Sequence, residues 1–165
     1  MLSGFTGGQK KDPSYKEVAR GLTQHVEAVQ ISYDPEKITY NDLLEIFWRN
    51  IDPTDDGGQF VDRGQQYRPA IFYHDAEQKR LAEAAKAELQ ASGVYEKPVV
   101  IEIVPFETFY DAEQYHQDYY KKNPVRYNFY TFNSGRYQFI EKVYGEDYEL
   151  DFSQYKPGGM TKTSN

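Results

Sequence analysis

The strongest constraint on the fold is a repeated change in hydrophobic period along the chain, from the two-residue repeat of strands to the 3.6-residue repeat of helices. Residues 24–34 alternate as a strand does, and residues 40–50 carry apolar side chains at helical spacing. Residues 69–74 and 98–105 read as two more strands, with a second helix capped by Asp75 between them. Strands that alternate with helices predict an α/β or α+β domain.

Weaker signals lie at both ends of the chain. Gly4 to Gly8 reads as a Gly-rich turn, and Asp111 is expected to cap a third helix over residues 112–122. A short helix is expected from Gly135 to Tyr144. The element order is typical of the back part of a ferredoxin-like two-layer sandwich, an α+β fold with a mixed or antiparallel sheet. We expect one domain over residues 1–145 and a polar C-terminal tail over residues 146–165.

Composition excludes several classes of function. The chain has 165 residues and a formal net charge of −7 without a basic run, so nucleic acid is a poor candidate partner. No stretch approaches the roughly 20 apolar residues of a membrane span, and no signal-peptide pattern is present. Zero cysteines exclude disulfides, thiolate metal sites and a cysteine nucleophile within this chain, and the three histidines lack zinc spacing. We therefore expect a cytoplasmic monomer without a bound metal.

Glu27 is the most informative single residue. It shares a face of the expected strand with Val29, Ile31 and Tyr33. If this face is the core face, desolvation would raise the pKa of the Glu27 carboxyl and keep it protonated near neutral pH. A neutral carboxylic acid can act as a general acid or donate a hydrogen bond to an oxygen that gains negative charge. The alternative is a solvated carboxylate at the strand end.

A long polar stretch over residues 53–66 supplies a second candidate group. It has no hydrophobic period, and loops of this length in a compact domain tend to be functional. Asp62 within it could pair with Glu27 as the two carboxylates of a glycosidase do. The alternative is that Asp62 is a turn former or a surface charge, as most loop aspartates are.

Several longer motifs resemble those of the A-type peptide methionine sulfoxide reductases: GFTGG, DPSYKEV, HVEAVQISYDP, LLEIFWRNIDPTDDGGQFVDRGQQYRPAIFY and FYDAEQYHQDYYKKNP. The similarity runs in order from Gly4 to about Tyr144. It implies reduction of methionine S-sulfoxide, free or in proteins, by a cysteine thiolate at a helix N-terminus in a GCFW motif. Thioredoxin or another thiol then regenerates the cysteine, and no cofactor is bound.

The resemblance also implies roles for four residues. Glu27 would protonate the sulfoxide oxygen, Tyr15 and Tyr67 would donate hydrogen bonds to it, and Asp62 would help to hold the substrate and its water network. The GCFW segment precedes the GFTGG motif in the family, whereas only residues 1–3 precede it here.

We therefore expect a domain that is missing its first strand and helix, is poorly stable and is inactive in reduction. The alternative is a cysteine-less pseudoenzyme that binds methionine sulfoxide, or a partner, without turnover.

Overall fold

A computed structural model describes residues 1–145 of the chain, and the predicted tail over residues 146–165 lies outside these residues. The three-stranded antiparallel sheet has the order β2-β1-β7, with β1 at Leu2–Thr6, β2 at Val26–Gln30 and β7 at Phe109–Asp111. The parallel pair consists of β5 (Ala70–Tyr73) and β6 (Glu102–Pro105). A short hairpin pairs β3 (Gly58–Gln59) with β4 (Asp62–Arg63).

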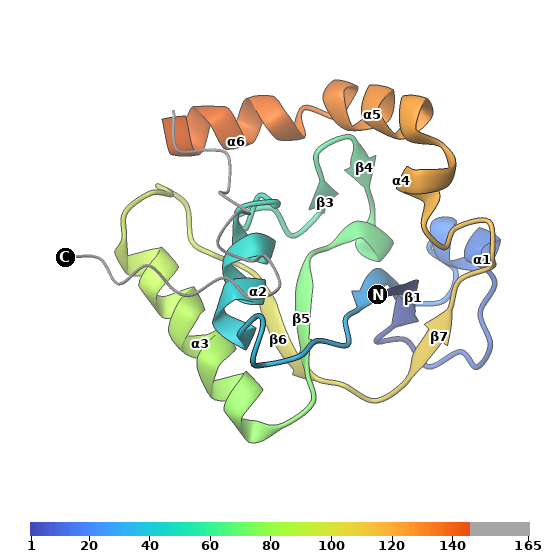
Figure 1. The fold of residues 1–165 in the computed structure, drawn as a ribbon, viewed down its shortest axis with the longest axis horizontal. Coiled ribbons are helices and arrows are strands. Elements are labelled where there is room, and N and C mark those ends of the chain that lie inside the picture. The colour runs from blue at the N-terminus through green and yellow to red at the C-terminus, as the bar shows by residue number, and fades with distance from the viewer. Residues whose placement is uncertain (146–165) are drawn as a thin grey trace.

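The helices are distributed around these sheets. They are α1 (Tyr15–Ala19), α2 (Tyr40–Trp48), the 3-10 turn η1 (Gln65–Tyr67), α3 (Ala76–Ala91), α4 (Tyr119–Lys122), α5 (Pro124–Asn133) and α6 (Arg136–Tyr144). In Figure 1, α2 and α3 lie beside β5 and β6, and α5 and α6 run along the side of the molecule nearest to the β3–β4 hairpin. The predicted α+β class is confirmed.

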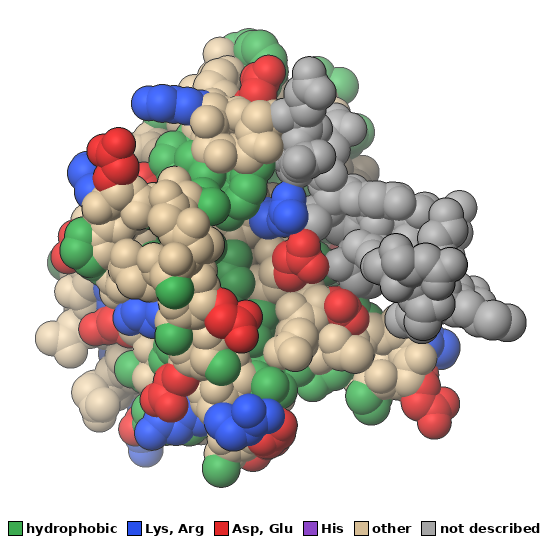
Figure 2. All heavy atoms as spheres, turned by 90° about the vertical axis from the view of Figure 1, so that its left-hand side faces the viewer, with side chains coloured by type: hydrophobic (Ala, Val, Ile, Leu, Met, Phe, Trp, Pro, Cys, Tyr) green, Lys and Arg blue, Asp and Glu red, His purple; other side chains and the backbone are tan. Residues whose placement is uncertain are grey.

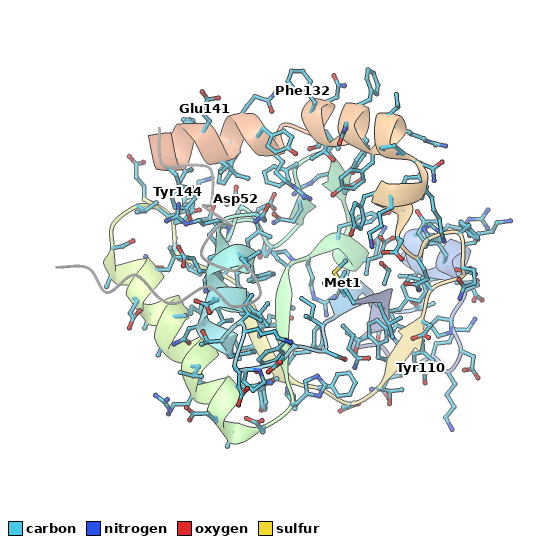
Figure 3. The ribbon with its side chains drawn as sticks, in the orientation of Figure 1. Met1, Asp52, Tyr110, Phe132, Glu141 and Tyr144 are labelled. Carbon is cyan, nitrogen blue, oxygen red and sulfur yellow. The ribbon has the colours of Figure 1, made fainter. Side chains whose placement is uncertain are left out.

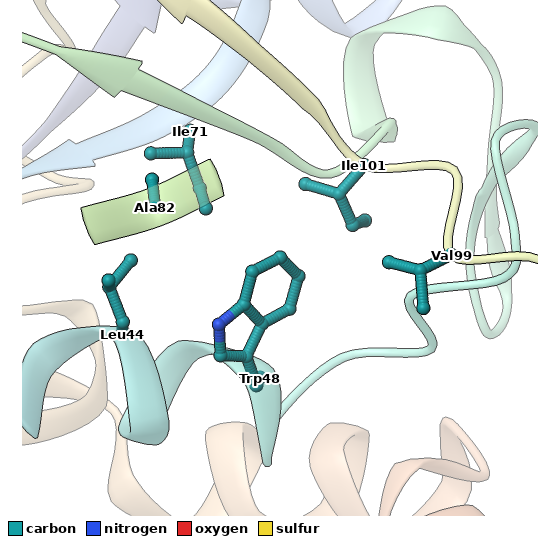
Figure 4. Packing of buried hydrophobic residues seen from close by; sticks show 6 residues of the cluster. All are labelled: Leu44, Trp48, Ile71, Ala82, Val99 and Ile101. Atoms are coloured by element: carbon teal, nitrogen blue, oxygen red, sulfur yellow. The ribbon is translucent and has the colours of Figure 1, made fainter. Parts of the chain in front are cut away.

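Helices α2 and α3 begin where the sequence predicts. Thr39 Oγ1 accepts a hydrogen bond from the Asp42 backbone N–H at 3.2 Å, and Asp42 accepts one from the Thr39 N–H at 2.8 Å. Asp75 caps α3 by accepting from the Gln78 N–H at 2.8 Å. The main core lies between these helices and the β5–β6 pair, as Figure 4 shows; it consists of Leu44, Trp48, Ile71, Ala82, Val99 and Ile101.

A second, smaller core lies on the three-stranded sheet. Phe5 of β1, Val18 of α1 and Ala112 are buried together, with Tyr15 and Tyr110 packed against them. Burial of these apolar groups fixes the short helix α1 on the sheet. This second core matters for function because it fixes α1, which bears Tyr15, against β1.

Two local predictions are wrong. Residues 2–6 form strand β1, and the turn is restricted to the residues that follow it. Residue 4 of this strand is a glycine because β7 approaches closely there. A Cβ at this position would lie 2.2 Å from the Tyr110 carbonyl oxygen. The helix expected over residues 112–122 is reduced to α4, and Asp111 ends β7. Asn123 and Pro124 do end α4, as expected, and Pro124 also begins α5, where its missing N–H costs nothing.

The strands of residues 26–30 and 70–73 belong to different sheets. β2 is the outer strand of the three-stranded sheet, and β5 pairs only with β6, so one edge of each carries no further strand in residues 1–145. Exposed apolar side chains accompany the β2 edge, among them Leu2, Val29 and Ile31. The sheet surface next to β2 is therefore incompletely covered in this part of the chain.

The surface in Figure 2 carries interspersed acidic and basic side chains. On α3 several of them form ion pairs within one helical turn, such as Arg80 with Glu77 at 2.6 Å and Lys79 with Glu83 at 3.8 Å. Such exposed pairs contribute little to stability. They leave this face without a continuous patch of one charge.

Candidate active site

Strand register places Glu27 on the same face as the smaller core. Glu27 lies opposite Phe5 in the β1–β2 pair, and Phe5 lies opposite Tyr110 in the β1–β7 pair, so all three side chains project from one face. Along β2 this face is not a continuous core face, because Glu27, Val29 and Ile31 are all exposed. Glu27 therefore stands at the open margin of an otherwise covered face.

Tyr67 reaches this margin because two glutamines bind η1 to neighbouring elements. Gln66 is buried, and its side-chain amide donates to the Ala19 carbonyl at the end of α1 at 2.9 Å. The Gln65 amide donates to the carbonyl of Gln24, just before β2, at 3.2 Å. These bonds hold η1 between α1 and β2 and place Tyr67 beside Glu27.

Tyr15 comes to the site from α1. Its backbone N–H donates to the Glu113 carboxylate at 3.2 Å, which satisfies one of the unpaired N–H groups of the first helical turn. Its ring packs 6.4 Å from the Phe5 ring and 3.9 Å from the His116 ring, measured between centroids. Tyr15 therefore belongs both to the smaller core and to the face that bears Glu27.

Asp62 lies in a hairpin that the sequence did not predict. The polar stretch over residues 53–66 folds into β3 and β4, with Arg63 paired to Asp55 on one side of the hairpin. Side chains alternate along a strand, so Asp62 faces the other way, where the hydroxyl of Tyr130 donates to it. Asp62 is thus a half-buried strand residue with a hydrogen-bond donor from another element.

The environment of Glu27 favours its protonated form. Burial of the carboxyl, followed by the nearby charge of Asp62, raises the pKa of Glu27 from 4.5 to about 7, although a hydrogen bond from Tyr67 works in the opposite direction. The side chain as a whole is exposed, so protein desolvates the carboxyl from one side only. A group that changes charge near neutral pH can give or take a proton there.

Both tyrosines are held as hydrogen-bond donors. Burial, and then the charge of Glu27, raises the pKa of Tyr67 to about 12. The same two causes, in the same order, raise the pKa of Tyr15. Asp62 also acts on both hydroxyls. The four residues proposed from the sequence are thus coupled to one another in space, although they lie on four separate elements.

Two residues near the site carried no signal in the sequence analysis. Tyr130 contacts Asp62 from α5, in a segment for which no helix was expected. His116 packs its ring against that of Tyr15, and its buried Nε2 has no hydrogen-bond partner among the described residues. Burial lowers the pKa of His116, which favours the neutral ring. Both contacts are long-range, so no local pattern could have revealed them.

Residues 1–145 contain neither a metal-binding cluster nor a helix that could span a membrane. In this range no group of three or more acidic or histidine side chains could hold a metal ion. The helices of this range are also all too short or too polar to cross a bilayer. The coupled acid and hydroxyl groups around Glu27 are therefore the candidate active site.

Known proteins of one family resemble this chain over most of its length. Residues 1–148 match the family model described as peptide methionine sulfoxide reductase. The chain is 55% identical over 141 residues to the Listeria monocytogenes protein named peptide methionine sulfoxide reductase MsrA, covering 86% of this chain and 80% of that protein. It is 50% identical over 147 residues to a Vibrio cholerae protein named MsrA/MsrB, covering 89% of this chain but only 39% of that protein.

Solved structures give the same result. Mxr1 of Saccharomyces cerevisiae in its reduced form superposes with a TM-score of 0.70 at 35% identity, covering 75% of this chain and 71% of that one. Methionine sulfoxide reductase A of Corynebacterium diphtheriae superposes with a TM-score of 0.65 at 33% identity, covering 75% and 63%. The chain therefore belongs to the A-type peptide methionine sulfoxide reductase family.

Proposed function

We propose that this chain binds the sulfoxide group of methionine S-sulfoxide, free or in proteins, at the face that bears Glu27. The observation that carries the proposal is the Glu27 carboxyl with its pKa of about 7, next to the hydroxyls of Tyr67 and Tyr15. A sulfoxide oxygen carries partial negative charge and accepts hydrogen bonds. Protonated Glu27 and the two phenols supply donors for it, and Asp62 keeps the proton on Glu27.

Binding and proton donation complete only part of a reduction. Conversion of a sulfoxide to a thioether and water consumes two electrons and two protons. In the family the electrons come from a thiolate that attacks sulfur, with thioredoxin or another thiol as the final reductant. The 165 residues contain no cysteine. We therefore propose that this chain alone binds the sulfoxide without turnover, while its monomeric state and cytoplasmic location stay predictions.

The proposal predicts stereoselective binding that depends on Glu27. N-acetyl-methionine S-sulfoxide should perturb the NMR signals of Glu27 and Tyr67, whereas N-acetyl-methionine and the R-sulfoxide should bind more weakly. Substitution Glu27→Leu removes the donor and should weaken binding by about tenfold, the loss expected for one hydrogen bond. Val29→Leu, at an exposed position two residues along the same strand, should bind as the wild type does.

Two outcomes would contradict the proposal. A folded chain that binds none of the three ligands would remove the binding function. Loss of S-sulfoxide in the presence of dithiothreitol, above the rate without protein and abolished in Glu27→Leu, would show that turnover does not need a cysteine in this chain.

A further inference from the structure

The hairpin that bears Asp62 is held from outside by α5 and α6. At its tip the Phe60 ring lies 5.7 Å from the Phe139 ring and 5.6 Å from the Arg136 guanidinium. Phe60 has a φ of 54°, a conformation that a bulky side chain rarely adopts. Such a backbone persists only where its surroundings hold it in place. The two C-terminal helices therefore determine where the hairpin lies.

A hydrogen bond links α5 to Asp62. Tyr130 of α5 has a partly exposed side chain, and its hydroxyl donates to Asp62 Oδ2. Phe132, two residues further along, points away from the hairpin in Figure 3 and is exposed. Burial, together with the bond to Asp62, raises the pKa of Tyr130, so its hydroxyl stays a donor. The contact joins residues 68 positions apart in the sequence.

The charged and titratable groups around this contact fall into two sets. Glu27 is faced by Tyr15 from α1, Tyr67 from η1 and Asp62 from β4. Asp62 is faced by the same groups and by Tyr130 from α5, with Arg136 of α6 near enough to act on Tyr130. The Asp62 carboxylate therefore stands between the Tyr130 hydroxyl and Glu27.

We propose that Tyr130 is a positioning residue of the site: its hydroxyl fixes the Asp62 carboxylate toward Glu27, and this fixed charge retains the proton on Glu27. Tyr130 acts through Asp62 and does not itself touch the substrate. The use of that proton for a sulfoxide rests on the proposed function, but the coupling from Tyr130 through Asp62 to Glu27 does not.

The experiment follows the Glu27 carboxyl by ¹³C NMR during a pH titration, with the signal assigned by Glu27→Gln. In Tyr130→Phe the ring remains but Asp62 loses its partner and turns toward solvent. The apparent pKa of Glu27 should then fall by about 0.5, and Asp62→Asn should lower it at least as far. Tyr130→Phe should cause no further change in the Asp62→Asn background. Tyr137→Phe, an exposed tyrosine on α6, should leave the titration unchanged.

Two results would overturn the positioning role. One is an unchanged Glu27 titration in Tyr130→Phe, and the other is an equal shift in the presence and absence of Asp62. If Tyr130→Phe does not fold, the coupling is tested in Asp62→Asn by following the ¹³Cζ signal of Tyr130. Its titration should move to lower pH, and an unmoved titration would also overturn the role. None of these measurements needs a sulfoxide, so failed ligand binding would remove the proposed function and leave the coupling standing.

Discussion

Glu27 owes its chemistry to its position at the open margin of a covered sheet face. Its carboxyl is desolvated by the protein on one side and lies near the charge of Asp62, and both effects favour the neutral acid. A glutamate at the facing position of β1, where Phe5 is buried, would have no access to solvent. A glutamate further along β2 would be fully solvated, as the exposure of Val29 indicates. Only this register gives an acid that is protonated and also accessible.

The raised pKa predicts a specific dependence of stability on pH. Folded Glu27 has a pKa of about 7 against an ordinary value of 4.5, so between these values the folded state binds more protons than the unfolded state. The free energy of unfolding should therefore fall as pH rises through this window and level off above it. The loss should be on the order of 1 kcal/mol, because solvent screens this exposed group.

Urea unfolding of the wild type and of Glu27→Gln at a series of pH values measures this loss. The difference in stability between the two proteins should change in favour of the variant from pH 4.5 to pH 7. A constant difference across that range would mean that Glu27 has an ordinary pKa in the folded chain.

The sequence suggested which residues form the candidate site but not how they are arranged. Glu27 was singled out by strand alternation and, like Tyr15, Tyr67 and Asp62, by short motifs that are visible locally. The contacts that tune these residues come from elsewhere in the chain, as with Tyr130 on Asp62. Tertiary contacts of this kind have no local sequence pattern, so Tyr130 could not be predicted.

At the scale of elements, capped helices were predictable and paired short strands were not. Thr39 and Asp75 marked the starts of α2 and α3 because capping is a local interaction. β1 was missed because Gly4, Gly7 and Gly8 suggested a turn. Pairing with β2 on one edge and β7 on the other makes residues 2–6 a strand. The β3–β4 hairpin was missed because strands of two residues each show no period.

The β3–β4 hairpin is expected to tolerate no side chain at Gly58. This residue has a φ of 144°, and a Cβ there would lie 2.3 Å from the Asp62 carbonyl oxygen. Gly58→Ala should therefore lower stability by about 2 kcal/mol and displace Asp62, because backbone in that position cannot give way cheaply. The free energy of unfolding and the Glu27 titration measure the two effects.

Gly57→Ala is the matched control for this substitution. Its added Cβ would meet the guanidinium end of Arg63, 2.7 Å away, which is flexible and can move, and would lie at an ordinary contact distance of 3.5 Å from Asp55 Oδ1. It should change stability and the Glu27 titration much less than Gly58→Ala does. Equal effects at the two glycines would contradict the view that the hairpin backbone positions Asp62.

At the scale of the whole molecule, the three-stranded sheet and the β5–β6 pair are separate sheets, joined mainly through loops and helices. The main core packs α2 and α3 on the β5–β6 pair, and the smaller core packs α1 on the three-stranded sheet. In residues 1–145 no backbone hydrogen bonds connect β2 to β5 as ladder partners. Open strand edges with exposed apolar neighbours favour association with other chains. The two cores should therefore unfold with weak coupling.

This architecture predicts that the purified chain unfolds with low cooperativity and associates at high concentration. Urea unfolding should give a slope below that expected for a chain of 165 residues, and sedimentation should show concentration-dependent oligomers. Val29→Lys places a charge on the exposed face of β2 and should reduce association without lowering stability. Ser32→Lys makes the same change of charge beyond the strand and should reduce association less. A steep single transition at the full-length slope, in a chain that stays monomeric, would show that the open edges of β2 and β5 do not limit the stability of this fold.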